Sequence, residues 1–575
     1  RINNRGWIVG GSDGGSNAIT GLGGPDEIRN FGEISGDIII PGLTKDIFNA
    51  PGARLESNLV LANGDVTLFQ SGIVNPGGEY RIGNLDVYAN YETKNTSLYE
   101  ADLVLRTGET DNLTTRFQAD LNGTVELLAN EVGQAIPGTF VSEGIVNAQK
   151  GITIGDLKLI APKSAVASFD FDLIENRTDL AFQYTVDYAP KGLDPNSAAV
   201  GKAINGIQAA GSTSDFNSTA ALIFAQKTKD KLNSLYRQLS GATSTAFPQA
   251  ALAAGQAFQD AVNENLGSAI LSQFQRCIHQ IQSLKSGDEY TGDPADCGKW
   301  RTWINAGGSD ATTPGSGASS QSGYSTNAFN TSIGADTLIG SNTLVGIAGR
   351  LDNLWTTTTE PTTFGKTEGW SGMLYAKHHL APTTWLTGSF SAGGFTTDIT
   401  RQVNIQGYPS TEEGSSRSTA LGGNLRISHL INTGNQGSLT PSLGISWLQL
   451  NQDSYSETTT SDNSAYVQPG NPLIKTSNPG KASYSLTYDA ATYNSIPLEI
   501  SLTYKQPFKA NNGLTVIPRV SLGYAWDLGD TNRSLTARFR SAPKKSFTVD
   551  GTEAPSSWFN VGLGLDVAFN DRFSV

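Results

Sequence analysis

The feature that most constrains this chain is an alternation of apolar and polar side chains with a period of two, which begins at Trp300 and continues to the C-terminal end. It comes in segments about ten residues long, separated by polar loops rich in Gly, Ser and Thr. The clearest segment is LTVIPRVSLGYAWDL at 514–528. Because neighbouring side chains of a strand point to opposite faces, each segment predicts a strand with one apolar and one polar face.

Strand length and aromatic ends indicate that the apolar face meets lipid rather than a soluble core. Tyr504, Trp526, Phe559 and Phe569 lie toward the ends of their segments, where a strand in a bilayer would reach the lipid headgroups. A soluble sandwich would show the same alternation in shorter strands. We predict strands near 300–308, 326–338, 342–352, 368–379, 384–399, 418–431, 437–451, 495–508, 513–528 and 556–569, and the start of an eleventh at Arg572.

The alternation also assigns individual residues to the two faces of this expected barrel. The residues predicted to face lipid are Leu443, Ile445, Val520, Leu522, Val561, Leu563 and Leu565. Those predicted to face the lumen are Glu499, Lys505, Arg519, Ser521, Asp527 and Asp566. An antiparallel barrel in a bacterial membrane closes with an even number of strands, so ten to eleven segments predict a barrel that is incomplete at its C-terminal end.

Residues 1–190 contain Gly, Asn and short apolar runs in a loose repeat. An aromatic residue leads into a turn and a strand at Phe31, Phe48 and Phe69, which are 17 and 21 residues apart. This spacing suits one coil of a β-solenoid, specifically a right-handed β-helix, in which stacked coils share a continuous core. A β-sandwich with similar turns is the alternative.

Residues 191–298 differ in composition from the preceding part: they are rich in Ala, Gln, Leu and Lys, and their apolar residues recur at helical spacing. We predict a helical linker, and we expect Pro248 to interrupt it. Near its end, Cys277 and Cys297 enclose a short polar loop and are the only cysteines of the chain. A local disulfide in an oxidising compartment is therefore predicted, because two cysteines beside one histidine fall short of a zinc site.

Composition excludes several classes of protein. The net charge of −13 argues against nucleic-acid binding, which needs clustered Lys and Arg. The sequence contains no run of about 18 apolar residues, so no transmembrane helix is predicted. The start at Arg1 shows no signal peptide, so we expect the natural N-terminus to lie upstream.

Candidate chemical motifs lack the context they need, so no catalytic, cofactor-binding or metal-binding residue is predicted. Gly10, Ser12 and Gly14 match G-x-S-x-G without the strand and helix of a nucleophile elbow. His378 and His379 are adjacent on a strand and point to opposite faces, so they cannot converge on one metal ion.

The order of repeat, helix and alternating strands resembles the monomeric autotransporters of the type V secretion pathway, and five segments carry the resemblance. LYRQLSG resembles the family's helical motif before the barrel, although Ala242 stands where the family has Glu. The other four are KWRTWINAGG at 299–308, TSIGADTLIGSNTLVGIAGRL at 331–351, WFNVGLGLDVAFNDRFSV at 558–575 and SGIVNPGGEYRIGNLDVYANYE at 71–92.

The resemblance implies an all-β protein with a helical linker: a passenger end at 1–190, a linker at 191–298 whose last part plugs the pore, and a 12-stranded outer-membrane barrel from 299 to 575. The implied function is secretion and surface anchoring of the chain's own passenger, which is expected to be adhesive or structural and not an enzyme. The implied partners are outer-membrane lipid, the barrel-assembly machinery, periplasmic chaperones and a host surface ligand. The alternatives are the delivery stem of a surface enzyme encoded upstream, or a diffusion porin.

Overall fold

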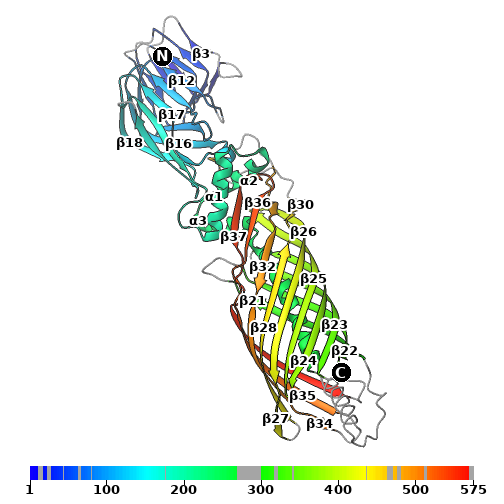
Figure 1. Ribbon diagram of the computed structural model, residues 1–575. Coiled ribbons are helices and arrows are strands. Elements are labelled where there is room, and N and C mark those ends of the chain that lie inside the picture. The colour runs from blue at the N-terminus through cyan, green and yellow to red at the C-terminus, as the bar shows by residue number, and fades with distance from the viewer. Residues whose placement is uncertain are drawn as a thin grey trace, which may run out of the picture.

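The computed structural model describes fifteen stretches of the chain. The described residues are 1–10, 17–21, 27–42, 45–62, 66–78, 81–174, 177–267, 300–315, 322–339, 342–359, 361–434, 437–462, 471–474, 481–509 and 515–568. The molecule is elongated, with a stack of short strands at one end, helices next to it and a sheet of long strands at the other end (Figure 1).

The N-terminal stack consists of short parallel strands in three rows, and each coil contributes to all three. The first row contains β1 (Ile2–Asn4), β4 (Ile28–Asn30), β7 (Ile47–Asn49), β10 (Thr67–Gln70), β13 (Asn90–Thr93) and β16 (Ala119–Asn130). The second row contains β2 (Trp7–Val9), β5 (Glu33–Ser35), β8 (Arg54–Glu56), β11 (Ile73–Val74) and β14 (Leu98–Val104), and it joins the first row through β16 into one sheet. The third row, which belongs to a second sheet, contains β3 (Asn17–Thr20), β6 (Asp37–Ile39), β9 (Leu59–Leu61), β12 (Asn84–Val87) and β15 (Asn112–Thr115).

This arrangement is a β-solenoid, and the alternative of a sandwich is wrong because neighbouring coils pair in parallel. The aromatic residues of the expected repeat are only partly aligned between neighbouring coils. Phe48 and Phe69 are in register and their rings stack with centroids 5.1 Å apart, but the partner of Phe48 in the preceding coil is Arg29 rather than Phe31.

The last coil continues into longer strands that end the solenoid. They are β17 (Gly138–Ala148), β18 (Ile152–Ile160), β19 (Ala167–Ile174) and β20 (Asp179–Val186). β20 pairs antiparallel with both β17 and β19, so the parallel stacking stops there. The short helix η1 (Val132–Gln134) lies beside this end and contacts the linker helices.

The linker forms α1 (Pro195–Ala209), α2 (Ser214–Phe224), α3 (Lys229–Ser240), the 3-10 turn η3 (Ala242–Thr245) and α4 (Ala246–Leu266). Asp194 caps α1 by accepting a hydrogen bond from the Ser197 N–H at 2.8 Å, and Gly241 ends α3 in the left-handed region. The helical run of the linker is interrupted just before Pro248 rather than at it, since α3 ends at Ser240 and α4 begins at Ala246. Pro248 is the third residue of α4, in the first turn, where the missing N–H costs no helical hydrogen bond.

The C-terminal part is one long-stranded antiparallel sheet, and each of the ten predicted segments forms a strand. The strands are β21 (Trp300–Thr313), β22 (Tyr324–Ile339), β23 (Thr343–Thr358), β24 (Thr363–Ala381), β25 (Thr384–Ile405), β26 (Tyr408–His429), β28 (Gly437–Gln452), β33 (Pro497–Lys505), β35 (Thr515–Asp527) and β38 (Ser557–Ala568). Small strands extend them: β27 (Ile431–Gly434), β30 (Thr458–Asp462), β32 (Ala491–Ser495) and β34 (Phe508–Lys509).

The sheet curves around α4 (Figure 1). Within the described ranges β21 and β38 each pair on one side only, and the expected eleventh strand at Arg572 lies outside these ranges. Strands β24, β25 and β26 have 19, 22 and 22 residues, whereas about 9–11 residues cross a bilayer. They therefore project well beyond a membrane at one rim.

A second, four-stranded sheet stands on that rim and was not predicted. It contains β29 (Tyr455–Ser456), β31 (Leu486–Tyr488), β36 (Ser534–Phe539) and β37 (Ser546–Asp550), all from the loops between long strands. One continuous cluster of buried apolar residues runs from the solenoid through α1, α2 and α3 into this rim sheet. None of the helices in the described ranges is long and apolar enough to cross a membrane.

Candidate functional site

The two faces of the long sheet differ sharply in what they contact. The seven residues predicted to face lipid, Leu443, Ile445, Val520, Leu522, Val561, Leu563 and Leu565, are all exposed on the face turned away from α4, and Leu563 is 81% exposed. Aromatic side chains accompany them: Trp447 and Trp526 lie exposed nearer the rim sheet, while Trp300 and Phe508 lie exposed at the opposite rim. An exposed apolar belt bounded by aromatic residues is what a lipid-facing surface requires.

The residues predicted to face the lumen make polar contacts on the other face. Glu499 pairs with Arg426 at 2.9 Å, Lys505 with Asp566 at 3.7 Å, and Arg519 with Glu264 of α4 at 3.2 Å. Asp527 accepts a hydrogen bond from the Ser495 hydroxyl at 2.6 Å. Ser521 is half-buried opposite Gly562 of β38.

The curved sheet encloses α4, which fills its interior. Phe258, Val262 and Leu266 pack in one apolar cluster with residues of β21, β23 and β24, among them Trp303 and Met373. Ala251, Leu252 and Ala254 pack in a second cluster with Leu354, Phe395, Leu448, Leu450 and Tyr493. A polar interior was expected, so these apolar patches beneath the helix are a feature that the alternation missed.

Glycines on the inner face let the helix approach closely. A Cβ atom at Gly365 of β24 would lie 2.2 Å from the Phe247 ring, and one at Gly422 of β26 would lie 3.0 Å from the Gln259 side chain. The inner surface of the sheet is therefore complementary to α4 both in shape and in charge.

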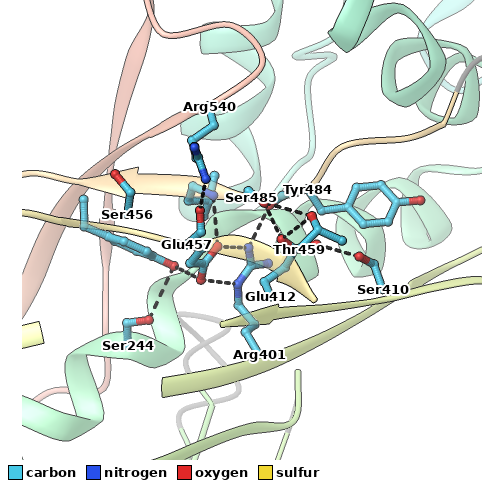
Figure 2. Close-up of polar contacts among 12 residues, drawn as sticks. Ser244, Arg401, Ser410, Glu412, Ser456, Glu457, Thr459, Tyr484, Ser485 and Arg540 are labelled. Carbon is cyan, nitrogen blue, oxygen red and sulfur yellow. Dashed lines mark hydrogen bonds and ion pairs between the residues drawn. The ribbon is translucent and has the colours of Figure 1, made fainter. Parts of the chain in front are cut away.

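At the rim that carries the small sheet, a buried ion pair joins strand β25 to the helical linker. Arg401 and Glu457 are both fully buried, and the Arg401 Nε donates to Glu457 Oε1 at 2.9 Å (Figure 2). The same guanidinium donates to the carbonyl oxygens of Gln238 in α3 and Tyr484, each at 2.8 Å. Glu457 also accepts from the Tyr488 hydroxyl and from the Leu486 backbone N–H, each at 2.9 Å, so each of its two oxygens accepts two hydrogen bonds.

A second buried carboxylate, Glu412, lies beside this pair (Figure 2). It accepts hydrogen bonds from the hydroxyls of Ser410 at 2.6 Å, Thr459 at 2.9 Å and Ser485. The cluster therefore joins strands β25, β26 and β30 to the rim sheet and to α3. Sequence reasoning missed it because Arg401 and Glu457 are 56 residues apart.

Several expected features fall outside the described residues. Cys277, Cys297, Ser12 and Gly14 are among them, so the predicted disulfide stays a prediction. His378 accepts or donates one hydrogen bond with the Thr343 hydroxyl at 2.8 Å, consistent with a strand end. In the parts of the chain that are described, no group of three or more His, Cys, Asp or Glu side chains could hold a metal ion.

Residues 302–470 and 474–575, whose described parts lie in the long sheet and its rim, match the family model of the autotransporter beta-domain. The chain carries the β-domain of a type V autotransporter. This autotransporter is an outer-membrane protein whose β-domain translocates the passenger carried on the same chain.

Solved structures similar to the autotransporter include three translocator domains. The translocator domain of NalP from Neisseria meningitidis is 16% identical, with a TM-score of 0.32, over 52% of this chain and 90% of that one. The beta domain of the Bordetella autotransporter BrkA is 13% identical, with a TM-score of 0.29, over 46% and 98%. The transport unit of AIDA-I from Escherichia coli is 11% identical, with a TM-score of 0.28, over 50% and 86%. No curated protein matches the chain.

The solenoid and helices α1–α3 adjoin the rim sheet (Figure 1). Taking the solenoid as the passenger, we call this rim the extracellular rim and the opposite one the periplasmic rim. Helix α4 then runs from the extracellular rim, where Phe247 meets Gly365, toward the periplasmic rim, where Leu266 packs against Trp303.

Proposed function

We propose that α4 is a plug that closes the pore once the passenger has crossed, and that the solenoid is a structural or adhesive passenger without enzymatic activity. The packing of α4 against the inner face of the long sheet is the observation that carries this proposal. Its 21 residues span about 30 Å at 1.5 Å per residue, which matches the hydrocarbon thickness of a bilayer.

The proposal divides the chain into a passenger end at 1–190, a linker at 191–298 and the β-domain at 299–575. Two observations support this division. The antiparallel strands β19 and β20 end the solenoid before residue 190, and α1 begins at Pro195. Helices α1–α3 pack on the rim sheet, whereas α4 is the one helix of the described residues that enters the interior of the long sheet.

The proposed face assignments follow from the contacts above. The seven exposed apolar residues from Leu443 to Leu565 face lipid, and Glu499, Lys505, Arg519, Ser521, Asp527 and Asp566 face the lumen. The proposed partners are outer-membrane lipid, the barrel-assembly machinery, periplasmic chaperones and a host surface ligand of the passenger. Cys277 and Cys297 are proposed to form a disulfide on the periplasmic side, which mass mapping under non-reducing conditions tests.

Ion conductance in planar bilayers tests the plug. The full chain should conduct little, with brief openings, because α4 fills the interior. Replacing residues 246–266 by a Gly-Ser segment of equal length should give large, steady currents. The matched control replaces only Glu264 by Gln, which removes one ion pair and keeps the helix. Equal and steady conductance in the full chain and the Gly-Ser variant would favour a diffusion porin.

Surface display tests the nature of the passenger. Cells that display the full chain should adhere to host surfaces more than cells that display a variant lacking residues 1–190. Equal adhesion would instead favour a solenoid that serves as the delivery stem of an enzyme located upstream.

A further inference from the structure

The last turn of α4 ends among three cations that come from three different strands. The Arg301 Nη1 of β21 donates to the Asn265 carbonyl oxygen at 2.9 Å, and the Lys377 Nζ of β24 donates to that of Leu266 at 3.0 Å. The Lys505 Nζ of β33 donates to the carbonyl oxygen of Gly267. Three consecutive carbonyl groups at the helix C-terminus, which carry its partial negative charge, are thus each held by a cation.

Two of the three cations also have carboxylate partners. Arg301 makes two hydrogen bonds to Asp336, at 2.8 and 2.6 Å, and Asp336 also accepts from the Tyr375 hydroxyl at 2.7 Å. Lys505 lies 3.7 Å from Asp566. These carboxylates hold the two cations on the inner face whether or not the helix is present.

Lys377 is different, because it is 5% exposed and pairs with no carboxylate among the described residues. Its ammonium lies 4.4 Å from the centre of the Trp385 ring and donates to the Leu266 carbonyl. A buried ammonium needs a negative or strongly dipolar partner, and here the end of α4 supplies it. The three cations and two carboxylates leave one positive charge at this rim, which the helix dipole offsets.

We propose that Arg301, Lys377 and Lys505 form a site for small inorganic anions at the periplasmic rim. Backbone carbonyl oxygens of α4 occupy the site while the helix is seated, and an anion such as chloride occupies it when the helix end withdraws. The site makes the opened pore prefer anions over cations, because rings of Lys and Arg select anions in other pores. This inference rests on the proposed plug, since the site opens only when α4 moves.

Ion selectivity of the full chain in planar bilayers tests the proposal, with potassium chloride at unequal concentrations on the two sides. During the brief openings of the unmodified chain, chloride should permeate several-fold better than potassium. In Lys377→Gln the ratio should fall toward one, and in Lys377→Glu it should invert. If the two Lys377 variants fail to insert into the membrane, Lys505→Gln provides a second test at a less buried position. It should also lower the permeability ratio.

The same strand offers a matched control. Lys366 of β24 is 52% exposed on the outer face and pairs with Glu368 at 2.7 Å, so Lys366→Gln should leave the permeability ratio unchanged. Openings should also become about tenfold more frequent in Lys377→Gln, because a hydrogen bond from a charged donor to the helix end is lost.

Two results would overturn the anion site: a cation-selective unmodified pore, or the same ratio in Lys377→Gln, Lys505→Gln and the unmodified chain. Neither result would contradict the plug. Steady full conductance in every variant would instead contradict the plug, and the ratio measured in those currents would still test the anion site.

Discussion

Leu522 and Ser521 are neighbours on β35 whose side chains point to opposite faces of the sheet. Leu522 is 44% exposed on the outer face, and Ser521 is half-buried on the inner face. We expect Leu522→Arg to impair assembly, because an Arg facing lipid near the midplane costs about 2–4 kcal/mol. The amount of folded protein in outer-membrane fractions measures the effect.

Ser521→Arg is the control for this pair of residues, since its guanidinium would enter the inner face, where Ser521 lies opposite Thr503 and Gly562. It should assemble nearly as well as the unmodified chain. Equal loss of assembly in both variants would mean that the outer face is not in lipid.

Asp111 is a fully buried carboxyl group of the solenoid that accepts hydrogen bonds from the backbone N–H groups of Gly83 at 2.8 Å and Asp102 at 3.0 Å. Burial, with a smaller contribution from the charge of Asp102, raises the pKa of Asp111 to about 8. Between the unfolded pKa of 3.8 and this value, the folded state binds a proton that the unfolded state has lost. The free energy of unfolding should therefore decrease as pH rises from about 4 to about 8, and change little above that.

The measurement is the urea concentration at which residues 1–190 become sensitive to protease, at pH 5 and at pH 8. Asp111→Asn cannot ionise, so most of the difference between the two pH values should disappear in this variant. An undiminished difference would assign the pH dependence to other groups.

At the scale of single elements, a ladder of amide side chains runs through the solenoid core. Asn4 donates to Asn30 at 2.8 Å, Asn30 donates to Asn49 at 2.7 Å, and the next coil places Gln70 in register with Asn49. Both polar atoms of the Gln70 side chain are buried without a hydrogen-bond partner among the described residues. The ladder is thus satisfied at its first three members and stops at the fourth.

Asn30→Leu and Gln70→Leu should therefore have unequal effects. Asn30→Leu leaves buried partners unsatisfied and should lower the free energy of unfolding by about 1–3 kcal/mol. Gln70→Leu breaks no described hydrogen bond and should cost far less. Urea unfolding of both variants, followed by protease sensitivity of the solenoid, compares them, and a larger loss for Gln70→Leu would contradict the ladder.

The elements that sequence reasoning found are those with a long periodic signal. Strands of 9 to 22 residues are predictable from the alternation of their apolar and polar faces. Helices such as α3 are predictable from leucines at helical spacing along one side, here Leu232, Leu235 and Leu239. The rim sheet was missed because its strands have only 2 to 6 residues and lie in polar loops. No local pattern can pair such strands, since their partners are distant in the sequence.

The site was predictable only in part, for a related reason. Alternation assigned Lys505 and Arg519 to the inner face, but their contacts depend on α4, which belongs to a different part of the chain. Lys377 and Arg301 could not be identified from the sequence, because each contacts a backbone carbonyl group at the end of α4, and no local sequence pattern signals such a partner.

At the scale of the whole molecule, Arg401 and Glu457 join the linker helices to the extracellular rim. Arg401→Met should leave the Glu457 carboxylate buried without its cation, which costs about 3–5 kcal/mol. We expect α3 to detach from the rim, so trypsin should cleave it faster at Lys229 or Lys231. Adding Glu457→Gln should restore part of the resistance.

Arg538→Met is the control for this prediction. Arg538 is 36% exposed in the same rim sheet, where it pairs with Asp489, and its loss should change the cleavage rate little. Equal cleavage in the two single variants would show that the buried pair does not hold the junction.

The continuous apolar core from the solenoid to the rim sheet has a mechanical consequence. Ala129 at the end of the solenoid pairs in parallel with Ile474 of a β-domain loop, and the rings of Phe216 in α2 and Phe539 in β36 lie 5.0 Å apart. In the described parts of the chain, one unbroken apolar cluster therefore joins the solenoid to the β-domain. A bound surface or flowing liquid can apply force to the far tip of the solenoid. Through this packing the force is transmitted as a torque to the β-domain, where it is distributed over many strands in the membrane.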